Sequence, residues 1–201
     1  MSRETEEIKN RRKQAAGEVY IMDGKRDVIG RVIITQEQIS RRAAEIGQMI
    51  EKDFEGEEVV LVGILRGAVL WMGDIMKNVG LDMIIDFMAV SSYGASTKSS
   101  GIVKINKDLD TDIEGKNVII VEDIVDSGTT LNYLKGYFEN REAKTVKICA
   151  LLDKPEGRTV DIKVDYKGFT VDDKFIVGYG LDYAQKYRNL PYITYLEDET
   201  V

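Results

Sequence analysis

The sequence predicts an α/β fold, a doubly wound and mostly parallel sheet flanked by helices, and three observations lead to this prediction. Short apolar runs rich in β-branched residues recur along the chain, as buried strands of a parallel sheet require. Segments with apolar residues at helical spacing separate these runs. Polar residues directly follow several runs, and this architecture binds ligands outside the C-terminal ends of its strands. We therefore expect one active site at that edge of the sheet.

The first half of the chain is predicted to contain three strands. Residues 31–34 predict a short strand, and a helix with an apolar stripe follows it. The run 59–65 predicts a buried strand followed by a second helix, and residues 83–90 predict a third strand. Residues 101–106 predict a short β-excursion. The polar section 94–100 is typical either of a mobile lid or of a disordered loop, and its composition leaves both open.

The second half is predicted to contain four more apolar runs, at residues 118–121, 144–152, 175–177 and 192–196. The first of them is the expected central strand. Two adjacent carboxylates, Glu122 and Asp123, are expected to end it, and residues 131–138 predict the next helix. No repeat, low-complexity tract or long linker divides the chain. A single domain is therefore expected.

Residues 122–130 carry the strongest chemical signal. Three carboxylates precede a turn of small or hydroxylated residues; the set is Glu122, Asp123, Asp126, Ser127, Gly128, Thr129 and Thr130. A glycine lets the backbone approach a ligand closely, and the free N–H groups of a helix start attract an anion. The carboxylates suit sugar hydroxyls or Mg²⁺. An acid and a glycine after a strand are common in ordinary loops, but this combination favours a sugar-phosphate site.

Two other predicted strand ends supply candidate ligands. Arg66 and Gly67 follow the run 59–65, and Lys154 follows the run 144–152. Arg66 is equally consistent with an anion ligand and with an ordinary surface arginine. Lys154 either donates to a ligand carbonyl or is exposed. The carboxyl ends of parallel strands meet at one edge, so these residues and the turn are expected to converge.

The composition narrows the chemistry. The 201 residues contain no histidine, so acid–base work falls to Asp, Glu, Lys or Tyr, and any metal should be a hard cation such as Mg²⁺. The net charge of −7 argues against nucleic-acid binding. Cys149 is the only cysteine, which excludes an intramolecular disulfide. With neither a membrane-length apolar stretch nor a visible secretory signal, we expect a cytoplasmic protein that does not bind membranes.

Residues 121–130 closely resemble the PRPP-binding motif of the type I phosphoribosyltransferases, where PRPP is 5-phosphoribosyl 1-pyrophosphate. Further similar segments narrow the resemblance to the hypoxanthine (guanine) branch; they are residues 65–68, 92–94, 151–154, 173–183 and 187–191. The similarity spans about residues 17 to 196 in order. It implies the type I phosphoribosyltransferase fold.

The resemblance also implies a domain organisation. Residues 19–201 would form one phosphoribosyltransferase domain, after an N-terminal tail or helix at residues 1–18. Its core would cover about residues 35–155. Residues 19–34 and 156–201 would form a small hood.

The resemblance implies purine salvage: Mg²⁺-dependent transfer of the 5-phosphoribosyl group from PRPP to N9 of a 6-oxopurine, hypoxanthine or guanine. The products would be IMP or GMP and pyrophosphate, with Asp126 as the base at purine N7. The implied ribose-phosphate ligands are Glu122, Asp123, Asp126, Ser127, Gly128, Thr129 and Thr130. The implied purine-binding residues are Lys154, Phe175, Ile176 and Asp182.

The remaining roles also come from the resemblance. It implies pyrophosphate binding by Leu65, Arg66, Gly67 and Arg188, with a cis peptide between the first two. It implies lid residues Ser92 and Tyr93, and Mg²⁺ ligands Glu122, Asp123 and Asp182. The chain departs from the family pattern at two positions. Arg66 stands where many relatives have Lys, and Thr129 stands where some relatives have Lys. Relatives usually form homodimers or homotetramers.

Three alternatives stay open beside this reading. One is a regulatory protein that binds PRPP without turnover; the short segment 1–18 and the acidic charge argue against its usual nucleic-acid-binding region. Another is a phosphoribosyltransferase that prefers xanthine. A third is one for another base, and the segments around Lys154, Phe175 and Asp182 argue against it.

Overall fold

The computed structural model describes residues 28–92 and 103–197. The chain divides into two compact units. The large unit spans Glu37–Asp173, and the small unit combines the described parts of Met1–Gln36 and Lys174–Val201. The predicted tail at 1–18, the lid section 94–100 and the lid residue Tyr93 lie outside the described residues.

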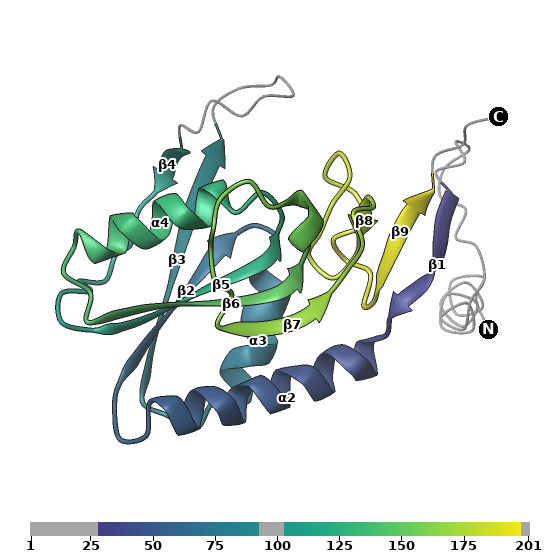
Figure 1. Cartoon of the computed structure of the whole chain (residues 1–201). Helices are drawn as coiled ribbons and strands as arrows, with labels where there is room; N and C mark the ends of the chain where they lie inside the picture. Colours follow the sequence, from purple (N-terminus) through teal and green to yellow (C-terminus); the bar gives the residue numbers. More distant parts are fainter. Residues whose placement is uncertain (1–27, 93–102, 198–201) are drawn as a thin grey trace, which may run out of the picture. The chain divides into compact units, whose positions relative to one another are not determined.

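The large unit contains a six-stranded sheet in the order β4-β3-β2-β5-β6-β7 (Figure 1). Its strands are β2 (Val59–Leu65), β3 (Met83–Ser92), β4 (Val103–Lys107), β5 (Asn117–Val125), β6 (Thr145–Asp153) and β7 (Tyr166–Thr170). All neighbours are parallel except β4, which pairs antiparallel with β3. This arrangement confirms the predicted α/β fold class and its mostly parallel sheet.

The end of the central strand corrects one prediction. Glu122 and Asp123 do not end the strand, because β5 continues through both of them to Val125. On one side β6 stays paired with it as far as the partners Val125 and Asp153. Completing backbone hydrogen bonds beside an existing strand outweighs the weak preference of two acids for a loop. The strand therefore carries these carboxylates on its own backbone.

Strand β7 was not predicted. It reads Tyr-Lys-Gly-Phe-Thr, in which only Tyr166 is fully buried. A short edge strand with a glycine has no continuous apolar run, so its pattern does not distinguish it from a loop. Its place in the sheet depends on parallel pairing with β6, from Cys149 with Tyr166 to Asp153 with Thr170.

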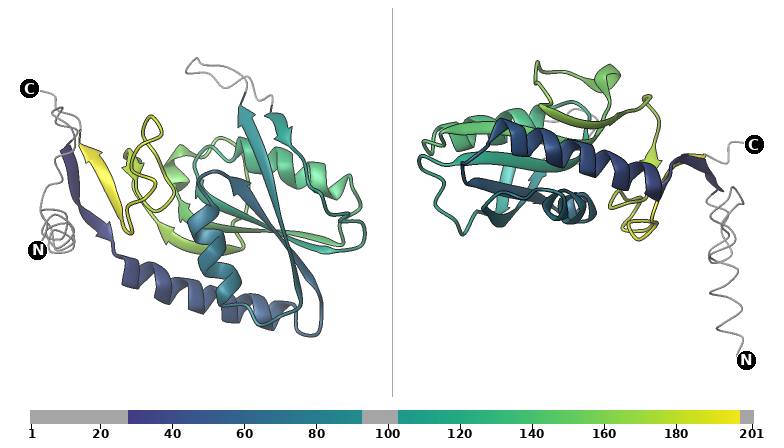
Figure 2. Two further views of the ribbon diagram at one scale, coloured as in Figure 1. Left: turned by 180° about the vertical axis from the view of Figure 1, so that it is seen from behind. Right: turned by 90° about the horizontal axis from the view of Figure 1, so that it is seen from below.

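Helices cover both faces of the large sheet, α4 (Thr129–Glu139) on one face and α2 (Gln36–Asp53) with α3 (Val69–Lys77) on the other (Figure 2). The alternation of strand side chains divides the core accordingly. On the α4 face the buried cluster includes Val60, Val62, Val118, Ile120, Leu131, Leu134 and Phe138. The predicted stripe of α2 is buried at Ile39, Ala43, Ile46 and Ile50.

The small unit is built on an antiparallel sheet in the order β1-β9-β8. Its strands are β1 (Val28–Ile34), β8 (Ile176–Val177) and β9 (Ile193–Glu197). A separate apolar cluster of Val177, Tyr187, Leu190 and Tyr192 packs inside it, with Val32 and Leu196 against it. Among the described residues, no helix has both the length and the apolar character needed to cross a bilayer.

Candidate active site

The C-terminal ends of three parallel strands meet at one edge of the large sheet. Register pairs Gly63 of β2 with Val121 of β5, and Val125 of β5 with Asp153 of β6. The Lys154 N–H donates to the Val125 carbonyl at 2.9 Å, so the pairing continues past the end of β6. The segments after β2, β5 and β6 therefore emerge side by side. Open α/β sheets bind their ligands at this edge, outside the carboxyl ends of the strands.

Glu122 and Asp123 place two negative charges together near the end of β5. Burial and the neighbouring Asp123 carboxylate raise the pKa of Glu122 well above its usual value. Asp123 Oδ1 accepts a hydrogen bond from the Ile124 N–H at 2.7 Å. Within the described part of the chain, neither carboxylate forms an ion pair with a lysine or arginine. Within these described contacts the pair has no cationic partner, and a bound divalent cation would offset the repulsion that helps to raise the pKa of Glu122.

The loop after β2 packs against this pair. The peptide bond between Leu65 and Arg66 is cis, as the resemblance implies. Gly67 lies so close to Asp123 that a Cβ atom at residue 67 would be 1.5 Å from Asp123 Oδ2. A larger residue here would have to displace the Asp123 carboxylate, so the loop packs directly against the carboxylate pair. Arg66 is exposed on this loop.

The turn after β5 has the backbone of an anion site. Gly128 adopts φ 81° in the left-handed region and immediately precedes α4, which begins at Thr129. The Thr129 N–H donates to Ser127 Oγ at 3.3 Å, and the Ser127 hydroxyl donates to Thr129 Oγ1 at 3.2 Å. With Thr130 in the same first turn, the free N–H groups and hydroxyls gather at the positive end of the helix.

A loop from β6 to β7 covers this turn, and sequence reasoning did not find it. The Thr159 N–H donates to the Ser127 carbonyl at 3.0 Å, and Thr159 Oγ1 lies 3.5 Å from Thr129 Oγ1. Arg158 forms an ion pair with Asp153 at the end of β6, which anchors the loop. Thr159 therefore adds a hydroxyl beside the turn. No local pattern indicates this, because the contact joins segments far apart in sequence.

Lys154 and Asp126 form the second half of the site. Lys154 is buried, with 8% of its surface exposed, and its Nζ lies 3.7 Å from Asp126 Oδ2. A second carboxylate oxygen, Asp173 Oδ1, lies closer, at 2.6 Å. Asp126 also approaches Gly157, where a Cβ atom would be 1.9 Å from Asp126 Oδ1. The Asp126 carboxylate thus lies near a buried ammonium and beside a glycine that leaves it space.

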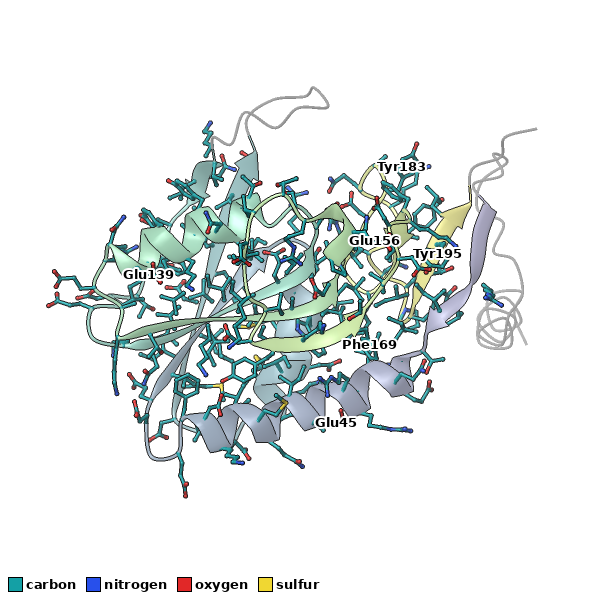
Figure 3. The ribbon with its side chains drawn as sticks, in the orientation of Figure 1. Glu45, Glu139, Glu156, Phe169, Tyr183 and Tyr195 are labelled. Atoms are coloured by element: carbon teal, nitrogen blue, oxygen red, sulfur yellow. The ribbon has the colours of Figure 1, made fainter. Side chains whose placement is uncertain are left out.

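The small unit carries two of the predicted purine-binding residues on β8 and just before it. Phe175 exposes 53% of its surface and meets Tyr183 edge-on, with ring centroids 5.5 Å apart. Its carbonyl accepts the Leu196 N–H at 2.9 Å. Ile176 is buried and pairs with Tyr195 of β9. Figure 3 labels Tyr183 on the loop after β8 and Tyr195 on β9.

Asp182 and Arg188 of the small unit pair with each other. Arg188 Nη2 lies 2.6 Å from Asp182 Oδ1, and Arg188 Nη1 donates to the Gly180 carbonyl at 2.6 Å. Asp182 Oδ2 accepts the Gln185 N–H at 2.8 Å. Both carboxylate oxygens thus have protein donors. These contacts give no separate support to a role of Asp182 in metal binding, which stays a prediction.

The large unit brings most of the predicted site residues to one edge: the carboxylates Glu122, Asp123 and Asp126, the turn Ser127–Thr130, the loop Leu65–Gly67, and Lys154. Ser92 ends β3, beside the lid section outside the described residues. In the described ranges, no group of three or more acidic or cysteine side chains is placed to hold a metal ion. A carboxylate pair suffices for Mg²⁺ where substrate oxygens and water complete the octahedron.

Comparisons with known proteins agree with this geometry. The family model of the phosphoribosyl transferase domain matches residues 33–184. A hypoxanthine-guanine phosphoribosyltransferase of Bacillus subtilis is 51% identical over 169 residues, 84% of this chain and 94% of that protein. A Bacillus anthracis structure of that name superposes with a TM-score of 0.81 at 48% identity, covering 84% of this chain and 99% of the other. A Staphylococcus aureus hypoxanthine phosphoribosyltransferase gives 0.82 at 44% identity, over 84% and 92%.

Proposed function

Because the chain belongs to the hypoxanthine-guanine phosphoribosyltransferase family, we propose that it is a purine-salvage enzyme that uses PRPP. In the proposed reaction, purine N9 attacks C1′ of PRPP while the bond from C1′ to the pyrophosphate oxygen breaks. Hypoxanthine and guanine are the proposed bases, and IMP or GMP and pyrophosphate are the products. The observation that carries the proposal is the approach of Asp126 to Lys154 directly beside the 127–130 turn, which we call the phosphate turn.

Asp126 is the proposed base. Attack by N9 makes the purine positive, and the proton on N7 then has to leave. A carboxylate within reach of N7 accepts it, which is chemistry that a chain without histidine can perform. Asp126 suits this role because it follows β5 directly and Gly157 leaves space for its carboxylate. Displacement at C1′ passes through an oxocarbenium-like state, so no covalent nucleophile is needed.

Lys154 is the proposed reader of the purine. Its ammonium is an N–H donor with no acceptor, so it selects a base with a carbonyl at C6 over one with an amino group. Burial of Lys154 strengthens this discrimination. Bulk water cannot replace a missing acceptor there, so a base without a carbonyl at C6 loses more binding free energy. Phe175, with half of its surface exposed, supplies a ring on which the base can stack.

The phosphate turn would hold the 5′-phosphate of PRPP. Thr129 stands where some relatives have Lys, so binding must depend on N–H groups and hydroxyls rather than on an ammonium. Two contacts support this: the left-handed Gly128 orients the first N–H groups of α4, and Thr159 adds a further hydroxyl. Arg66 and Arg188 are the proposed cations for the pyrophosphate.

Glu122 and Asp123 are the proposed ligands of Mg²⁺, together with ribose hydroxyls of PRPP. The closeness of the two carboxyl groups, which together with burial raises the pKa of Glu122, supports a divalent cation. When bound, Mg²⁺ would neutralise charge on the leaving pyrophosphate. The chain's own part is to hold the pair close to the loop after β2, where the absence of a side chain at Gly67 leaves room for the Asp123 carboxylate.

The decisive experiment offers PRPP and Mg²⁺ together with hypoxanthine, guanine, xanthine or adenine, and measures nucleotide and pyrophosphate formation. We expect turnover with hypoxanthine and guanine, and little with adenine. Binding of PRPP without any turnover would instead identify a regulatory protein, and a clear preference for xanthine would reassign the substrate. Omission of Mg²⁺, or chelation of it, should abolish turnover.

We further propose that the enzyme works in the cytoplasm as a homodimer or homotetramer. Relatives named hypoxanthine-guanine phosphoribosyltransferase support this only through family membership. Size-exclusion chromatography with light scattering measures the mass of the assembly against that of the 22.7 kDa chain. A monomer at working concentration would contradict the oligomeric part of the proposal.

A further inference from the structure

Lys154 lies between two carboxylates, and it is much closer to one of them. Its Nζ lies 2.6 Å from Asp173 Oδ1 and 3.7 Å from Asp126 Oδ2. The first distance is that of a short, charge-assisted hydrogen bond, and the second is beyond hydrogen-bond distance. The Lys154 side chain is 10% exposed, whereas both carboxylate side chains are 57% exposed. The ammonium therefore rests on Asp173, not on the proposed base.

A buried ammonium requires a partner of opposite charge. Among the described residues, Asp126 and Asp173 are the carboxylates within ion-pair distance of Lys154 Nζ. If Asp173 carried no charge, Asp126 would be the remaining ion-pair partner, and the 3.7 Å gap would close into a hydrogen bond. One oxygen of Asp126 would then accept a hydrogen bond from Lys154. A carboxylate whose charge is partly neutralised by an adjacent ammonium is a weaker acceptor for a purine proton.

We propose that Asp173 is a positioning residue, which holds the Lys154 ammonium away from Asp126 and so leaves the Asp126 carboxylate available to the purine. This role rests on the proposed function, because it concerns the same base and the same lysine. Asp173 itself has no direct role toward the substrate; its action passes entirely through Lys154. The backbone supports it, since the Val171 N–H donates to the Asp153 carbonyl at 3.0 Å and fixes the segment just before Asp173.

The test compares Asp173→Asn with the wild-type enzyme and with Glu156→Gln. Glu156 is an exposed carboxylate two positions after Lys154, labelled in Figure 3, and it forms no ion pair with Lys154. We expect Asp173→Asn to lower kcat about tenfold, the effect of one hydrogen-bond-sized change in barrier, with the KM for PRPP essentially unchanged. Asp173→Glu should recover most of the lost kcat, and Glu156→Gln should behave as wild type.

A double-mutant cycle separates positioning from a merely structural effect. If Asp173 acts through Lys154, the change Asp173→Asn should cause no further loss of kcat in a Lys154→Met background. Losses that multiply would overturn the proposal, and so would an unchanged kcat in Asp173→Asn. A wild-type enzyme inactive on every base would instead contradict the proposed function itself. Thermal unfolding of each variant confirms that the comparison is between folded proteins.

Discussion

Gly67 lies directly against the carboxylate of Asp123, where a Cβ atom at residue 67 would come within 1.5 Å of Oδ2. This contact joins the loop after β2 to the carboxylate pair of β5. It joins a loop and a strand of the proposed PRPP site, so a change at this contact should affect binding of both the pyrophosphate and the cation.

We expect Gly67→Ala to lower kcat/KM for PRPP by about 100-fold or more, because the added methyl group must displace the Asp123 carboxylate. Steady-state kinetics at saturating hypoxanthine measures the effect. Gly73→Ala is the matched control, since a Cβ atom there meets nothing within 4 Å and lies in the helix α3. That change should leave activity unaltered and stabilise the fold by up to about 1 kcal/mol. Similar kinetics for both variants would contradict the argument.

A substitution at Gly157 should displace the carboxylate of Asp126, the proposed base, in the way that one at Gly67 displaces Asp123. A methyl group at residue 157 would come 1.9 Å from Asp126 Oδ1 and push the carboxylate out of place. We expect Gly157→Ala to lower kcat by about 10- to 100-fold while the KM for PRPP changes little, because the 127–130 turn is not touched. Gly136→Ala in α4, where nothing lies within 4 Å, serves as the control. A fall in PRPP affinity alone would show that the turn, not the base, had moved.

Asp126→Asn tests the base itself. An amide has nearly the shape of the carboxylate but does not accept the N7 proton, so turnover should fall by roughly two to four orders of magnitude. PRPP binding, followed by equilibrium titration, should stay largely intact. Turnover close to that of the wild type would remove Asp126 from the mechanism.

Lys154→Met tests the selection of 6-oxopurines. The substitution keeps much of the buried volume and removes the donor, so the loss should be specific to bases with a carbonyl at C6. We expect kcat/KM for hypoxanthine to fall by about 10- to 100-fold relative to adenine, as a lost charged hydrogen bond implies. An unchanged ratio of hypoxanthine to adenine would refute this role. Parallel assays on both bases give the ratio directly.

Low pH should reduce the stability that Asp53 contributes through its contacts with Tyr166 and Lys147, away from the proposed active site. Hydrogen bonds from the Tyr166 hydroxyl at 2.7 Å and from Lys147 Nζ at 3.0 Å hold the pKa of Asp53 below its usual value. Since the folded-state pKa is the lower one, this stability is present above the unfolded-state pKa of about 3.9 and is lost as the pH falls through the folded-state pKa.

The measurement is urea unfolding of Asp53→Asn and the wild type at neutral and acidic pH. Because 41% of the Asp53 side chain is exposed and solvent screens its contacts, we expect a loss of less than about 1 kcal/mol at pH 7. This loss should shrink as the pH falls below about 4. Asp161→Asn, which changes an exposed carboxylate between β6 and β7, provides the control at both pH values. A difference that stays constant with pH would show that the Asp53 contacts act by shape alone.

Strand positions were predictable wherever burial is continuous. The run 59–65 coincides with β2, because a parallel strand covered on both faces is apolar at every position. The same reasoning fails at the edge, where β7 has one fully buried residue. It also ended β5 too early at Glu122, because ladder pairing with β6 continues past the point where the side chains become polar.

The chemistry of the turn was likewise readable from residues 122–130. A glycine and hydroxyls close together in sequence predicted the turn that opens α4, and its role as an anion site stays a proposal. Three contacts were not readable: Asp173 with Lys154, Gly157 with Asp126, and Thr159 with the turn. Local composition specifies periodicity and turn conformation, whereas these contacts depend on the register of β6 beside β5 and on the path of the loop after it. Side chains distant along the chain become partners only when the folded backbone brings them within a few ångströms.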